Sequence, residues 1–111
     1  MSYPNYYPQL NRTVTICGSM RLFESMLALA RQLTIDGYLV LMPFVFMKDD
    51  DPNADRLHKM HLDKIELSCI VYVLTEGGYI GKTTQEEIDY AKREGKEIRY
   101  VELMLAEYQP A

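Results

Sequence analysis

Residues 69–88 of the chain read CIVYVLTEGGYIGKTTQEEI. The first six are a continuous apolar run, which is typical of a strand covered on both faces of a parallel sheet. A glycine-bearing turn follows at 76–81, and Thr83 and Thr84 each precede a glutamate by three residues, the spacing of a capping box. The stretch therefore predicts a central buried strand that passes through a tight turn into a helix.

The same alternation of strand and helix extends over most of the chain. Strands are predicted at 13–17, 38–42, 69–74 and 97–101, and helices from Ser19 to about Ile35, over about 54–67, and from Thr83 or Thr84 to Gly95. Right-handed crossovers join such strands into a parallel sheet. We predict a single-domain, doubly wound α/β fold of the flavodoxin or Rossmann-like kind, with about four parallel strands and helices on both faces.

One domain is expected, because the 111 residues lie within the commonest domain size of roughly 100–150. Residues 1–12 are predicted to form an extended arm, since their tyrosines and prolines follow no period. The α/β domain is expected over residues 13–103, and residues 104–111 form a tail. Apolar side chains near this end favour a homodimer or a larger assembly, and they are Leu103, Met104, Leu105 and Tyr108.

The net charge and the apolar pattern restrict the class of partner. The formal charge is −4, which argues against a protein that grips a nucleic-acid duplex through a basic surface. No apolar run approaches the roughly 18–20 residues that span a bilayer, and residues 1–5 do not resemble a secretion leader. Cys17 and Cys69 lie in predicted apolar strands, which favours free thiols in a reducing compartment. We therefore expect a cytoplasmic protein that binds a small molecule.

Parallel sheets of this kind bind their ligands beyond the carboxyl ends of the strands. The residues predicted at that edge are Gly18, Ser19, Pro43, Gly81, Thr83 and Thr84. The first two follow the first strand, the third follows the second strand, and the others belong to the turn after the third. Helix N-termini at the same edge direct backbone N–H groups toward an anion. A nucleotide-like ligand is therefore expected there.

Two other patterns suggest different chemistry. Residues 81–83 (GKT) are similar to the end of a phosphate-binding Walker A loop, but the first glycine of that loop is replaced by Glu76, whose carboxylate would repel phosphate. His58 and His61 are three residues apart on a predicted helix. Without a third clear ligand, one surface and one core histidine are favoured over a zinc site. We predict neither a metal nor another cofactor.

Two adjacent glutamates in the third helix face in different directions. Helical geometry places Glu86 and Glu87 about 100° apart. Glu87 lies near the face of Ile88 and Ala91, which must pack on the sheet, whereas Glu86 points toward water and can close a capping box with Thr83. We expect the helix dipole to favour Glu87 as an anion beside the cleft. Glu87 is therefore a candidate catalytic carboxylate, and an ordinary glutamate near a helix start is the alternative.

Three segments of the chain carry a family resemblance. Residues 17–21 (CGSMR), 64–65 (KI) and 78–91 (GYIGKTTQEEIDYA) resemble the nucleoside 2-deoxyribosyltransferase-like superfamily. This superfamily includes the 2′-deoxynucleoside 5′-monophosphate N-hydrolases and many small uncharacterised bacterial and phage proteins. The resemblance covers about residues 13–101 and is most specific over 78–91. It implies a nucleoside or nucleotide as the small-molecule partner.

The resemblance also implies roles for individual residues. Glu87 takes the place of the nucleophile that attacks C1′ of the deoxyribose and expels the base, so the resemblance and the helical face select the same carboxylate. Ser19 and Arg21 take positions that hold a 5′-phosphate in the monophosphate hydrolases. The chain differs from the active members at His61, where they carry an aspartate, and from the N-hydrolases at Thr15, where they carry a tyrosine. His61 is expected to contact the ligand from its inward-facing position.

Three functions agree with these residues. The leading hypothesis is an enzyme, an N-glycosidase or deoxyribosyltransferase, that cleaves the N-glycosidic bond of a 2′-deoxynucleoside or its 5′-monophosphate through Glu87. A catalytically inactive nucleotide-binding module is favoured by His61 in place of the aspartate. An interaction protein that keeps the fold only as a scaffold is the third hypothesis.

Overall fold

The computed structural model describes residues 12–44 and 51–103 of the chain. Its elements in chain order are β1 (Thr13–Cys17), the 3₁₀ turn η2 (Met20–Leu22), α2 (Phe23–Ile35), β2 (Leu39–Leu41), α3 (Ala54–Leu67), β3 (Ile70–Glu76), α4 (Lys82–Arg93) and β4 (Glu97–Leu103). The predicted tail and most of the predicted arm lie outside the described residues, so the homodimer stays a prediction. None of the described helices is long and apolar enough to cross a membrane.

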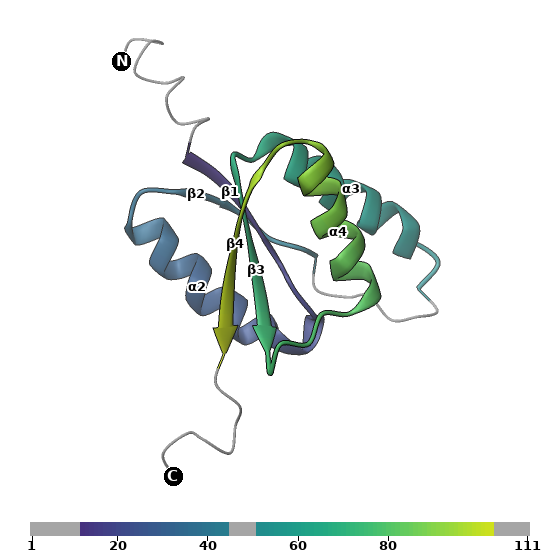
Figure 1. Cartoon of the computed structure of the whole chain (residues 1–111), viewed down its shortest axis with the longest axis horizontal. Helices are drawn as coiled ribbons and strands as arrows, with labels where there is room; N and C mark the ends of the chain where they lie inside the picture. The colour runs from purple at the N-terminus through teal and green to yellow at the C-terminus, as the bar shows by residue number, and fades with distance from the viewer. Residues whose placement is uncertain (1–11, 45–50, 104–111) are drawn as a thin grey trace.

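The four strands form one parallel sheet in the order β2-β1-β3-β4 (Figure 1). Val14 of β1 lies opposite Val40 of β2 on one side and opposite Ile70 of β3 on the other. β4 pairs with β3 as far as Leu103 opposite Glu76, so it extends beyond its predicted end because β3 itself continues that far. The order of the strands reverses between β1 and β3, which makes this the switch point of the sheet. The predicted α/β fold is confirmed.

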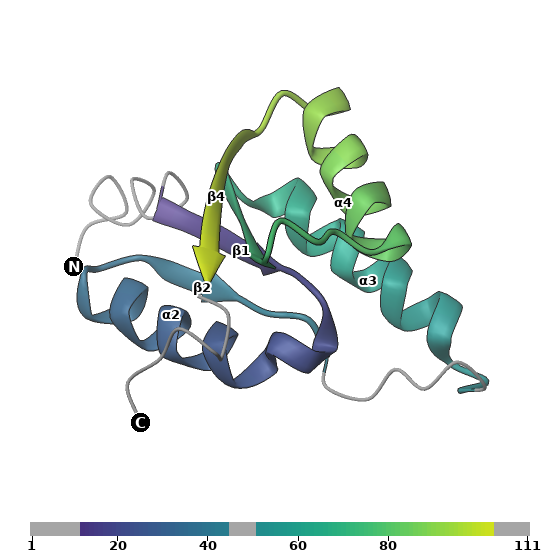
Figure 2. The same cartoon turned by 60° about the horizontal axis from the view of Figure 1, so that its bottom comes forward.

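Helices cover both faces of the sheet, with α2 on one face and α3 and α4 on the other (Figures 1 and 2). Successive side chains of a strand point to opposite faces. In β1, Ile16 therefore packs in the core cluster that includes Met26 of α2, while Cys17 packs in the cluster that includes Ile65 of α3 and Ile88 of α4. This alternation directs the last side chain of β1 toward the two helices that carry the candidate site residues.

The start of α4 differs from the sequence prediction. The helix begins at Lys82, with Gly81 in an extended conformation at the N-cap, and no side chain makes a capping hydrogen bond. The predicted capping box between Thr83 and Glu86 is therefore wrong, because Thr83 is already inside the helix and cannot act as its cap. Ser19, where the first helix was predicted to start, precedes the 3₁₀ turn η2, and its side chain makes no capping hydrogen bond.

We expect Gly18→Ala to destabilise the fold by about 1–3 kcal/mol, because overpacking a tight core position costs this much. A methyl group at Gly18 would lie 2.9 Å from Cε of the fully buried Met26 and 3.2 Å from the backbone oxygen of Leu74. Urea denaturation measures the change. Ser19→Ala is the neighbouring control and should stay within about 0.5 kcal/mol of the parent. Equal stability of the parent and Gly18→Ala would contradict the close approach of β3 to this turn.

Candidate active site

A pocket of about 390 Å³ opens at the carboxyl ends of the strands. It is lined by Gly18, Ser19, Met20, Pro43, Phe44, Leu57, His58, His61, Tyr79, Gly81, Lys82, Thr83, Thr84 and Glu87. These residues come from the segments that follow β1, β2 and β3 and from the facing sides of α3 and α4. The volume falls within the range of small-molecule sites, roughly 300–1,000 Å³.

The pocket brings together most of the residues that the sequence predicted for the site. Those found in its lining are Gly18, Ser19, Pro43, His61, Gly81, Thr83, Thr84 and Glu87. Arg21 is not among the lining residues. Its Nη1 donates a hydrogen bond to Oε1 of Glu76 at 2.7 Å, and its guanidinium lies 5.8 Å from the ring centroid of Tyr79, which does line the pocket. Arg21 therefore borders the site through Tyr79.

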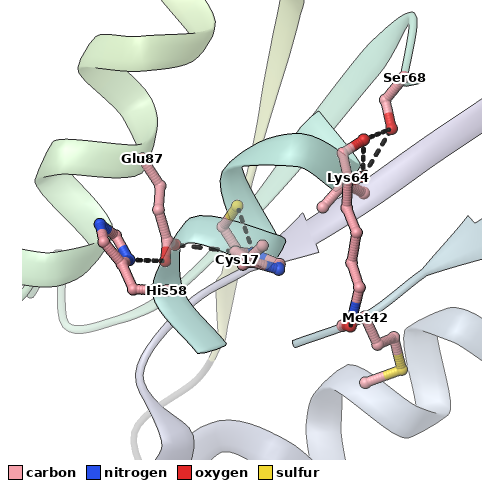
Figure 3. A network of polar contacts seen from close by, with 8 residues as sticks. Cys17, Met42, His58, Lys64, Ser68 and Glu87 are labelled. Atoms are coloured by element: carbon pink, nitrogen blue, oxygen red, sulfur yellow. Dashed lines mark hydrogen bonds and ion pairs between the residues drawn. The ribbon is translucent and has the colours of Figure 1, made fainter. Parts of the chain in front are cut away.

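A buried cluster of three titratable side chains, Cys17, His61 and Glu87, borders the pocket, which His61 and Glu87 line. Sγ of Cys17 is 3.4 Å from Nε2 of His61, and the same nitrogen is 3.8 Å from Oε1 of Glu87. His58 lies on the side of the Glu87 carboxylate away from Cys17, with Nδ1 3.6 Å from Oε2 of Glu87 (Figure 3). The two histidines thus contact different oxygens of one carboxylate.

The periodicity of the elements explains this convergence. Cys17 is the last residue of β1 and faces α3, while His58 and His61 are one helical turn apart on α3 and share a face. On α4, Glu87 belongs to the buried stripe and is 6% exposed, whereas Glu86 is exposed. The prediction that Glu87 faces inward and Glu86 faces water is confirmed.

Burial controls the charge of the cluster. Desolvation raises the pKa of Glu87 from 4.5 to about 7, although the contact with the Cys17 thiol opposes this change. Desolvation lowers the pKa of His61 to about 4, and the charges of Lys64 and His58 lower it further. Burial, and then the charge of Glu87, raise the pKa of the Cys17 thiol. Near neutral pH, His61 and Cys17 are therefore uncharged.

The expectation that the helix dipole holds Glu87 as an anion is wrong. Because α4 begins at Lys82, Glu87 lies in the second turn, and the effect of the dipole declines beyond the first turn. The loss of water around the carboxylate outweighs what remains of it.

Sequence reasoning missed two contacts at the site, that of Cys17 with His61 and that of His58 with Glu87. Cys17 was expected to pack in an apolar strand, and it is fully buried there, but its contact with His61 was not predicted. His58 was expected at the surface, whereas its side chain is only 24% exposed. The three-residue spacing of His58 and His61 was the available signal. A third partner could not be identified from it, because Cys17 and Glu87 reach the histidines only through the sheet topology.

A hydrogen-bond network holds α3 against β1. The hydroxyl of Thr15 donates to the backbone oxygen of Lys64 at 3.0 Å and lies 2.5 Å from the hydroxyl of Ser68. The ammonium group of Lys64 donates in turn to the backbone oxygen of Met42 at 2.6 Å (Figure 3). The network joins β1, α3 and the end of β2, and it fixes the turn of α3 that follows His61.

The glycine-bearing turn after β3 is held from the neighbouring strand. The carboxylate of Glu102 on β4 accepts hydrogen bonds from the backbone N–H groups of Gly77 at 2.5 Å and Gly78 at 3.0 Å, and from the hydroxyl of Thr75 at 2.7 Å. These hydrogen bonds lower the pKa of Glu102, and the bond from Thr75 has the largest effect on it. Glu102 thereby positions the turn that leads to Tyr79 and the start of α4.

Comparisons with known proteins place the fold. Neither a scan of protein-family models nor a search of curated protein sequences finds a match. The structure is similar to that of a 2-desoxiribosyltransferase from Leishmania mexicana, with a TM-score of 0.64 and 18% sequence identity. The match covers 82% of this chain and 64% of that protein, so the chain spans less than two thirds of its length. At this identity the similarity establishes a deoxyribosyltransferase-like fold.

We predict that Glu87→Gln stabilises the protein at pH 8 by an amount on the order of 3 kcal/mol, and that the gain disappears at pH 4.5 and below. The folded pKa of Glu87, about 7, lies above its unfolded value of 4.5, so the contribution of Glu87 to stability is complete below pH 4.5 and is lost as the pH rises through 7. Glutamine resembles the protonated carboxyl group at every pH.

Urea denaturation of the parent and the variant across this pH range measures the difference. Glu86→Gln is the matched control, because Glu86 is exposed, and its effect should not follow the same pH dependence. A gap between the parent and Glu87→Gln that stays constant from pH 4.5 to 8 would contradict the burial of Glu87 as an uncharged group.

Proposed function

We propose that the chain cleaves the N-glycosidic bond of a 2′-deoxynucleoside or its 5′-monophosphate, as an N-glycosidase or deoxyribosyltransferase with Glu87 as the nucleophile. One observation carries the proposal: a buried carboxylate opens into a pocket at the switch point of a deoxyribosyltransferase-like sheet. The sequence resemblance selects the same residue.

The proposed reaction has two steps. An oxygen of Glu87 forms a bond to C1′ while the bond from C1′ to the base nitrogen breaks, and the base leaves with that electron pair through an oxocarbenium-like transition state. Water or a second base then attacks C1′ of the glycosyl ester and releases the carboxylate. A pKa of about 7 leaves a substantial ionised fraction of Glu87 near neutral pH, and the charge is poorly solvated, which favours attack.

The surroundings of Glu87 suit this role. His58 and His61 lie 3.6 and 3.8 Å from the two oxygens of the carboxylate, one beside each oxygen. Phe44 and Tyr79 offer aromatic surface to a base. Polar side chains and backbone N–H groups at the start of α4 can hold the sugar or a phosphate.

A nucleotide-binding module without catalysis is the second candidate. It is favoured by His61, which takes the position where active members of the superfamily that this sequence resembles carry an aspartate. An imidazole cannot supply the negative charge of that aspartate, and His61 is uncharged near neutral pH because its pKa is about 4.

The first test compares two neighbouring glutamates. We expect Glu87→Gln to abolish the release of free base from deoxynucleosides, because the amide cannot form the glycosyl ester. Glu86→Gln should retain the parental rate, since Glu86 points to solvent. Single-turnover chromatography with a panel of deoxynucleosides and their monophosphates gives both rates. Parental activity in Glu87→Gln would exclude it as the nucleophile, and a parent that releases no base would favour the binding module.

The second test concerns the phosphate position. Arg21 is paired with Glu76 through Nη1 in the structure, so a phosphate bound at Arg21 would share the guanidinium with Glu76 or displace it. We expect Arg21→Ala to weaken binding of a nucleoside monophosphate several-fold more than binding of the nucleoside. Calorimetric titration measures both, with Arg99→Ala as a control, since Arg99 is also paired with a carboxylate but lies on β4 outside the pocket lining. Equal losses for the two ligands would mean that Arg21 acts only by holding Tyr79.

A further inference from the structure

The buried cluster described above combines three kinds of metal ligand. A thiol from β1, an imidazole from α3 and a carboxylate from α4 place their ligand atoms within 4.8 Å of one another. The three side chains belong to residues that are 0%, 4% and 6% exposed, namely Cys17, His61 and Glu87. Each comes from a different element, so the cluster is assembled by the fold and not by a local sequence motif.

Two of the three separations between ligand atoms fall in the range expected for a tetrahedral ion. Bonds of about 2.0–2.3 Å to sulfur, nitrogen and oxygen place tetrahedral ligand atoms about 3.3–3.8 Å apart. Sγ of Cys17 and Nε2 of His61 are 3.4 Å apart, and Nε2 of His61 and Oε1 of Glu87 are 3.8 Å apart. All three ligand atoms lie within 4.8 Å of one another, so an ion would bring the Cys17 sulfur and the Glu87 carboxylate closer together.

The hydrogen bonding of the cluster is incomplete. Nδ1 of His58 is buried and has no hydrogen-bond partner among the described residues, although it lies 3.6 Å from Oε2 of Glu87. Buried polar atoms are nearly always paired, so an exception suggests a missing ion or water. With Oε1 bound to a cation, the other oxygen of Glu87 would remain to accept a hydrogen bond from His58, an arrangement common around metal ligands.

We propose that Cys17, His61 and Glu87 bind one divalent cation of the zinc class through Sγ, Nε2 and a carboxylate oxygen. Mixed sulfur, nitrogen and oxygen ligands favour Zn²⁺ over Mg²⁺ or Ca²⁺, which prefer oxygen alone. Cys17 binds as the thiolate and releases its proton to solvent. Because His61 and Glu87 line the pocket, the fourth position opens to it and takes water or an anionic ligand.

The cation would also regulate the proposed reaction. An oxygen of Glu87 that is bound to the ion cannot attack C1′, so metal binding and glycosyl transfer exclude each other. This consequence rests on the proposed function, whereas metal binding itself does not.

Cobalt titration of the full chain, freed of metal with a chelator, tests the site. One equivalent of Co²⁺ should produce a thiolate-to-cobalt charge-transfer band, and Zn²⁺ should displace it. Cys17→Ser should lose the band, while Cys69→Ser, which changes the other cysteine of the chain, should keep it. Glu87→Gln should raise the Kd for Zn²⁺ at least tenfold, and Glu86→Gln should leave it unchanged.

Several results would overturn the site: no band in the parent, a band lost in Cys69→Ser but kept in Cys17→Ser, or equal Kd values for Glu87→Gln and Glu86→Gln. Far-ultraviolet circular dichroism establishes that each variant is folded, and the glutamate pair decides if Cys17→Ser does not fold. For regulation, one equivalent of Zn²⁺ should suppress base release and a chelator should restore it. Unchanged base release by the zinc-loaded protein would overturn mutual exclusion. A parent protein that releases no base with or without zinc would contradict the proposed function, and the cobalt titration alone would then decide whether the metal site exists.

Discussion

The parallel register of β1 against β3 pairs Val14 with Ile70 and Cys17 with Val73. This pairing fixes where β1 ends relative to β3. After β1 the chain passes to α2 on one face of the sheet, and after β3 it passes to α4 on the other face. Gly18 follows one strand, and the turn that leads to α4 follows the other. The contact of Cys17 with His61 depends on that alignment, because a shift by one residue would turn the Cys17 side chain toward α2.

The site concentrates groups that the rest of the core excludes. A thiol, two imidazoles and a carboxylate meet where α3 and α4 cover the end of β1, and ring nitrogens of His58 and His61 are buried there without hydrogen-bond partners among the described residues. A buried unpaired polar group costs about 1–3 kcal/mol. Elsewhere in the described sheet the buried faces are mainly aliphatic. Buried polar groups that are left unpaired in this way are expected where a protein acts on a ligand.

The fold could be predicted from the sequence because its signals are local. The apolar run after Ser68, the spacing within α3 and the glycine that ends α4 each depend on neighbouring residues, and α3 begins and ends as predicted. Glu87 could be separated from Glu86 because a helix converts sequence position into direction. The fold class and most of the pocket lining followed from the same reasoning.

Features that depend on distant residues could not be predicted. Arg21 meets Glu76, and Cys17 meets His61, across separations of 55 and 44 residues. No periodicity in the sequence encodes these pairs. The capping box failed for a different reason, because Gly81 allowed α4 to begin before either threonine could cap it. The charge of Glu87 depended on burial by two other elements, which the helix alone could not reveal.

The anchoring of the glycine turn by Glu102 has an evolutionary consequence. Gly77 and Gly78 contribute no side chains, so the carboxylate on the adjacent strand accepts hydrogen bonds from both backbone N–H groups. Selection on the shape of the pocket therefore also acts on Glu102, which lies on the edge strand and outside the pocket lining. Among descendants of this sequence, residues 77, 78 and 102 should change together, and lineages that lose the acidic side chain should also redesign the turn.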